Sequence, residues 1–174
     1  MKKKLSIFVV LISLIAVVTS VYAQEDADLF FSAKQSVKNG NRDFAFMQFH
    51  SLLRLSKSSF YHQEALFATG EYYFDMANYF DAYTSFSKLI ELYPKSEALP
   101  FAIVYLLKME QMHSQDSEYD LKKKVITFKQ ISLLFSEYKE YLYESPLGLK
   151  YKAIYFIDRV EVYINEAIFE TVYF

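Results

Sequence analysis

The chain has 174 residues, 53% of them hydrophobic, which suits one domain with a buried core. It has a net charge of −2 and no cysteine, which excludes disulfides, thiolate metal sites, a cysteine nucleophile and lipidation on an N-terminal cysteine, and disfavours nucleic-acid binding. With only three glycines and three prolines, the chain offers little material for hairpins or glycine-rich loops, so its composition favours an all-α fold.

Residues 1–23 have the layout of a signal peptide. Residues 2–4 are lysines, residues 5–18 form an apolar run, and residues 21–23 (Val-Tyr-Ala) fit a small-residue cleavage site. Cleavage after this site is the first interpretation, and a retained anchor helix is the second because the run is about long enough for a short membrane span. In both cases the remaining domain, residues 24–174, is predicted to be exported.

Two helices are predicted before residue 60. The first covers residues 24–41, with acidic residues near its start and Asn-Gly-Asn at its end, where these residues tolerate left-handed geometry. The second covers residues 42–59. Together they form a first helix pair.

Residues 63–96 predict a second pair of amphipathic helices, around which the rest of the chain is interpreted. Apolar residues recur at offsets of three, four and seven, which places them on one face of each helix. Residues 76–78 supply the turn, and Pro94 ends the second helix because proline lacks the amide donor that a helix needs.

Gly70 is the small residue that this pair is expected to need. We expect it to face Ala82 and let the two backbones approach closely. Phe86 and Tyr73 would then fill the space on either side.

Several residue types recur at an interval of 37 residues, which indicates an internal repeat. A repeat of helix pairs in an all-α chain predicts a right-handed α-solenoid, in which each pair buries the flank of the next. The recurring pairs are Ala45 and Ala82, Phe49 and Phe86, Leu52 and Leu89, Ser59 and Ser96, and Ala65 and Ala102.

A third unit is predicted after Ser96. Pro100 suits the first turn of a helix that ends near residues 113–116. A long helix is expected from about residue 118 to residue 143, and a last helix from Ser145 to the chain end.

The central pair resembles the tetratricopeptide repeat, and the runs 86–109 and 145–174 resemble the periplasmic branch typified by the BamD family of outer-membrane assembly factors. The resemblance implies a superhelix of helix pairs that binds protein partners, such as the barrel-assembly machinery. Two features depart from the family: the chain stops where two further helix pairs normally follow, and it lacks the lipidated cysteine. The residues that carry the repeat pattern are Leu66, Gly70, Tyr73, Ala82, Phe86 and Pro94.

In such a superhelix the first helix of each pair lines a concave groove. Exposed aromatic and charged side chains there would suit an extended peptide or a partner loop. The alternative for the phenylalanines is plain packing between repeats. The residues predicted to bind a partner in this groove are Glu71, Tyr72, Phe101, Tyr105 and Lys108.

No set of residues with the spacing of an active site is found in the sequence. The three histidines (His50, His62 and His113) are isolated, and no phosphate loop, dinucleotide fingerprint or Gly-x-Ser-x-Gly motif occurs. The sequence therefore predicts neither an enzyme nor a cofactor or metal site. A small enzyme or ligand-binding bundle is kept as an alternative that would need a deep polar cavity.

The function predicted from the sequence is a non-enzymatic protein–protein interaction module of the bacterial cell envelope, acting in outer-membrane protein assembly. The alternative is a periplasmic scaffold linked to cell division and peptidoglycan synthesis, similar to CpoB. In both cases the protein is expected in the periplasm, at the periphery of the outer membrane, and associated with the membrane only through its partners. The sequence does not define an oligomeric state.

Overall fold

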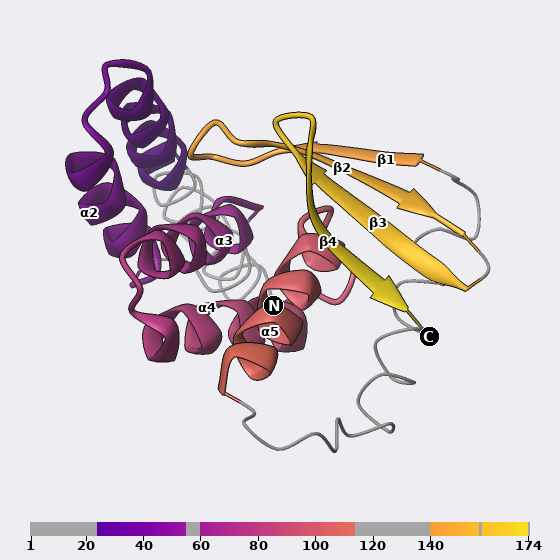
Figure 1. The fold of residues 1–174 in the computed structure, drawn as a ribbon. Helices are drawn as coiled ribbons and strands as arrows, with labels where there is room; N and C mark the ends of the chain where they lie inside the picture. The colour runs from indigo at the N-terminus through magenta and orange to yellow at the C-terminus, as the bar shows by residue number, and fades with distance from the viewer. Residues whose placement is uncertain (1–23, 55–59, 114–139, 157, 174) are drawn as a thin grey trace, which may run out of the picture. The chain divides into compact units, whose positions relative to one another are not determined.

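The computed structural model describes residues 24–54, 60–113, 140–156 and 158–173 (Figure 1). Among them, helices come first and strands follow: α2 (Arg42–Leu52), α3 (Phe60–Asp75), α4 (Tyr79–Leu92), α5 (Leu99–His113), β1 (Glu140–Glu144), β2 (Lys150–Tyr155), β3 (Arg159–Ile164) and β4 (Ala167–Tyr173), with a further helix at 24–38 ahead of α2. The chain divides into two compact units, Met1–His62 and Gln63–Phe174. The predicted signal peptide lies outside the described residues.

The first unit contains the predicted helix pair. Helix 24–38 ends at Gly40, whose φ of 77° is a left-handed conformation that glycine adopts without strain. The side chain of Asn41 then accepts a hydrogen bond from the backbone N–H of Phe44 and caps α2. Phe30 and Phe49 pack edge to face between the two helices, with ring centroids 5.9 Å apart.

In the second unit the predicted pair at 63–96 is confirmed. Helix α3 ends at Asp75, the turn contains Ala77 at a φ of 57°, and Asn78 caps α4 through its side chain. Helix α4 ends at Leu92, two residues before Pro94.

Gly70 does make the close approach, but its neighbour is a ring of α4. A β-carbon placed on Gly70 would lie 2.7 Å from two ring atoms of Phe86. The Phe86 ring is itself fixed, because it stacks on Tyr105 at 4.7 Å and meets Phe67 edge to face. The glycine therefore provides the space that this ring occupies.

The prediction of an all-α right-handed solenoid was wrong. Residues 140–173 form an antiparallel sheet in the order β1-β2-β3-β4, where the sequence had predicted the end of one helix and the whole of another (Figure 1). Inward-facing residues alternate along the strands, as Tyr151 and Ala153 do in β2 and Val160 and Val162 do in β3. This period of two is typical of a strand with one buried face.

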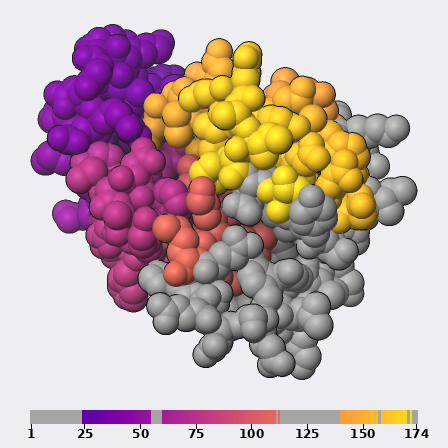
Figure 2. All heavy atoms as spheres, viewed as in Figure 1, coloured from indigo at the N-terminus to yellow at the C-terminus, as the bar shows by residue number. Residues whose placement is uncertain are grey.

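The turns of the sheet explain how a chain poor in glycine can form hairpins. Asn165 and Glu166 join β3 to β4 with φ values of 49° and 69°, as a two-residue hairpin turn requires. Asparagine tolerates this conformation better than most residues, while the glutamate accepts some strain. Gly148, with a φ of 83°, serves the β1–β2 connection. In Figure 2 the yellow atoms of the C-terminal strands adjoin those of α5.

Replacing Gly70 with alanine tests the close approach to Phe86. The added methyl group must displace a ring held on both sides, and overpacking of this kind costs about 1–3 kcal/mol. The better helix propensity of alanine offsets up to about 1 kcal/mol. We expect a net loss in the free energy of unfolding, measured by urea denaturation.

A double-mutant cycle with Phe86→Leu is the control. Because the smaller side chain leaves room for the methyl group, Gly70→Ala should cost less in that background. An equal cost in both backgrounds would contradict the proposed clash.

Candidate functional site

Three of the five residues predicted to line a groove lie in the core between helices and sheet. Glu71 is 0% exposed and Tyr105 is 2% exposed, and Phe101 is equally buried. The chain's own strands β1 and β2 cover the faces of α3 and α5 that these residues occupy. The structure therefore does not bring them together in an open trough.

The other two predicted residues are half-buried. Tyr72 lies on α3, and the ammonium group of Lys108 lies 3.8 Å above the ring of Phe169 in β4. The same ammonium group is 5.8 Å from the ring of Phe74. Lys108 thus connects α5 to the edge of the sheet through cation–π contacts.

Two tyrosines of the sheet bind two carboxylates of α3. The hydroxyl of Tyr151 donates a hydrogen bond to Glu71 Oε1 and lies 2.8 Å from the hydroxyl of Tyr105. The hydroxyl of Tyr143 donates to Glu64 Oε2 at 2.9 Å. We call these residues the tyrosine–glutamate network. The sequence did not lead us to expect the two strand tyrosines of this network, Tyr143 and Tyr151. The signal that could have found them is the high tyrosine content together with the alternation of buried and exposed residues around Tyr151.

Burial raises the pKa of Tyr151 and of Tyr143 well above the ordinary value for tyrosine. The negative charges of Glu71 and Glu64 raise both further, because a phenolate beside a carboxylate is repelled. Both hydroxyls therefore keep their protons and act as donors. The network joins strands β1 and β2 to helices α3 and α5.

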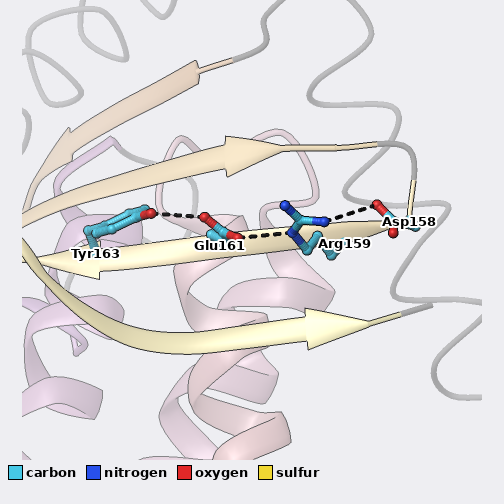
Figure 3. Close-up of polar contacts among 4 residues, drawn as sticks. All are labelled: Asp158, Arg159, Glu161 and Tyr163. Atoms are coloured by element: carbon cyan, nitrogen blue, oxygen red, sulfur yellow. Dashed lines mark hydrogen bonds and ion pairs between the residues drawn. The ribbon is translucent and has the colours of Figure 1, made fainter.

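The outer face of the sheet carries both apolar and charged side chains and has a hollow of about 770 Å³. Along β3 on this face, Tyr163 donates a hydrogen bond to Glu161 at 2.8 Å, and Arg159 Nε donates to the same carboxylate at 2.9 Å (Figure 3). These hydrogen bonds lower the pKa of Glu161. The lining residues of this hollow, called the outer hollow below, are Leu142, Lys150, Tyr151, Lys152, Ile154, Tyr163, Asn165 and Glu166.

A second hollow, of about 510 Å³, lies at the end of the helical hairpin. It is lined by Ala77, Asn78, Tyr79, Phe80, Tyr83 and Met109, and Met76 precedes it in the turn. Phe80 is 81% exposed, and Met76 and Tyr83 are also exposed. We call this region the hairpin-end surface. Exposed aromatic and methionine side chains gathered in one place are typical of protein interaction sites.

Two further properties concern only the described parts of the chain. They contain no group of three or more histidine, aspartate or glutamate side chains arranged to hold a metal ion. None of their helices is both long and apolar enough to cross a membrane.

Removing the hydroxyl of Tyr151 tests the network. In Tyr151→Phe, Glu71 and Tyr105 each lose a hydrogen-bond partner in a buried site, which costs about 1–3 kcal/mol. Tyr163→Phe on the outer face of the same sheet is the matched control. Its loss in the free energy of unfolding should be much smaller, because water can take over the hydrogen bond of the missing hydroxyl. Equal losses in urea denaturation would contradict a role for the network in stability.

The raised pKa values also predict alkaline destabilisation. In the unfolded chain a tyrosine ionises near 10.0, whereas the folded Tyr151 and Tyr143 keep their protons to higher pH. Their contribution to stability is thus complete below pH 10 and decreases above it, by up to about 1.4 kcal/mol per pH unit for each tyrosine. Urea denaturation across this range should show a shallower decrease in the Tyr143→Phe/Tyr151→Phe variant, and an unchanged slope would refute the assignment.

No protein-family model matches the chain, and no curated protein matches it either. The resemblance to the tetratricopeptide and BamD families thus has no support beyond the sequence pattern, and the all-α architecture that it implied is contradicted by the sheet.

Proposed function

We propose that this protein is a non-enzymatic interaction module that binds another protein through the hairpin-end surface. The observation that carries the proposal is the 81% exposure of Phe80 on the first turn of an ordered helix. A phenylalanine in this position leaves a large apolar area in water, and burial of an aromatic ring is among the largest single contributions to protein association.

The surroundings of Phe80 suit a partner that supplies apolar side chains. Tyr83 lies one turn along α4, and its hydroxyl donates a hydrogen bond of 3.4 Å to Glu110 of α5. Met76 in the preceding turn is exposed, and methionine adapts its shape to the groups that contact it, whereas Met109 closes the hollow from the core side. Asn78 caps α4 and also donates to Asp81, so the turn is held in place before a partner arrives.

The cellular setting stays a prediction of the sequence. Export depends on residues 1–23, and outer-membrane protein assembly and a division-linked scaffold remain the first and second settings. The groove formerly expected to hold the partner is not part of this proposal, because Glu71, Phe101 and Tyr105 are buried in the helix–sheet core. The identity of a crosslinked partner would separate the two settings: barrel-assembly components indicate the first and peptidoglycan-synthesis proteins the second.

A photo-crosslinking amino acid placed at position 83 tests the proposed surface. We expect a specific crosslinked product in cells, and we expect Phe80→Ser to reduce partner affinity by roughly tenfold or more, as the loss of an aromatic anchor does. Leu92→Ser, at the other end of α4 and also exposed, is the matched control and should leave the product unchanged. Equal crosslinking in wild type, Phe80→Ser and Leu92→Ser would refute the proposal.

A further inference from the structure

The hairpin-end surface places a projecting ring beside a hollow. Phe80 is 81% exposed, and Met76 in the preceding turn is 64% exposed. Phe80 also lines the hollow of about 510 Å³, together with Tyr79, Tyr83 and the buried Met109. A partner that covers both the ring and the hollow must supply several apolar side chains in a row, as one face of an amphipathic helix does.

Carboxylates are the charged groups of this surface. The runs 75–84 and 109–112, which form it, contain Asp75, Asp81 and Glu110 but no lysine or arginine. Glu110 lies at the wall of the hollow, because it accepts the hydrogen bond of Tyr83. The ends of two helix dipoles also meet here, the negative end of α3 and the positive end of α4, and their opposite signs largely cancel. The carboxylates therefore set the sign of the charge.

Asp81 is the carboxylate that directly follows Phe80. The side-chain amide of Asn78 donates to Asp81 Oδ2 at 2.8 Å, and an amide donor orients a carboxylate without neutralising it. Within the described ranges no ion pair involves Asp81. Lys108, the lysine next to this surface in the sequence, has its ammonium group 3.8 Å above the ring of Phe169 in β4. Asp81 therefore presents a negative charge beside the exposed ring.

We propose, on the basis of the function proposed above, that the partner docks through a basic amphipathic segment. Its apolar side chains would cover Phe80 and fill the hollow, and a lysine or arginine beside them would pair with Asp81. Complementary charge of this kind contributes more to the choice of partner and to the rate of association than to affinity. An acidic segment is disfavoured, because its carboxylates would approach those of the hairpin-end surface.

The test uses the full chain and two peptides with the same leucine pattern of an amphipathic helix, one with lysine and the other with glutamate on its polar face. Methionine methyl resonances in an NMR titration report binding, because Met76 belongs to the hairpin-end surface whereas Met47 is exposed on α2 of the first unit. We expect the lysine peptide to shift Met76 but not Met47 and to bind more tightly than the glutamate peptide. Added salt should reduce this difference, since it screens charges in solvent.

Asp81→Asn removes the charge and keeps an acceptor for the amide of Asn78. We expect it to weaken binding of the lysine peptide about twofold to fivefold, which is the range for exposed ion pairs. Glu91→Gln, at an exposed position of the same helix, is the matched control and should leave the affinity unchanged. Glu166→Gln is a second control, because it removes a carboxylate that lines the outer hollow instead. Phe80→Ser should weaken binding of both peptides.

The outcomes separate this inference from the proposed function. Equal affinities of the wild type for the two peptides, no binding of the lysine peptide, equal shifts of Met76 and Met47, or equal effects of Asp81→Asn and Glu91→Gln would overturn the inference. The proposed function would still stand in that case if the crosslinked product at position 83 depends on Phe80 in cells. A product that is independent of Phe80 would refute the proposed function itself. If both are correct, Asp81→Asn should also reduce the crosslinked product in cells, and Glu91→Gln should not.

Discussion

The hydroxyl group of Tyr151 is the interaction on which the second unit depends. It joins three elements, because β2 supplies the tyrosine, α3 supplies Glu71 and α5 supplies Tyr105. A carboxylate without hydrogen bonds is very costly inside a core, so Glu71 needs a donor wherever the sheet packs on α3. Tyr143 and Glu64 repeat the arrangement from the neighbouring strand. The tyrosines are opposite each other in the sheet, and the glutamates are two turns apart on one face of the helix.

These hydrogen bonds fix the position of the sheet on the helices, which the ring contacts alone do not do. Phe67 meets both Tyr143 and Tyr151 edge to face, and such contacts tolerate small shifts of the sheet over the helices. A shift of one residue in the strand register would instead turn Tyr151 to the outer face and leave Glu71 without its donor. The network therefore selects one register, while the aromatic burial supplies most of the driving force.

The parts of the fold that sequence reasoning predicted correctly are those set by local contacts. Asn78 and Pro94 mark the start and end of α4 within a few residues. Gly70 contacts Phe86 of the next helix in the sequence, so this contact is also local. The sheet depends on contacts that are distant in sequence, since Tyr151 lies 80 residues from Glu71. Its strands are short, and the Asn165–Glu166 turn lacks the glycine that usually marks a hairpin. The alternation of buried and exposed residues in this region was therefore missed, and the region was predicted to be helical.

The same reasoning explains why the candidate site was placed on the wrong side of the helices. In a solenoid the faces of α3 and α5 that carry Glu71, Phe101 and Tyr105 would line an open groove, but here the sheet covers them. A side chain that is already packed in the core contributes to folding, so a substitution there changes stability before it changes binding. Phe80 differs in this respect. Its large apolar surface remains in solvent at no benefit to folding, and binding is the process that can use it.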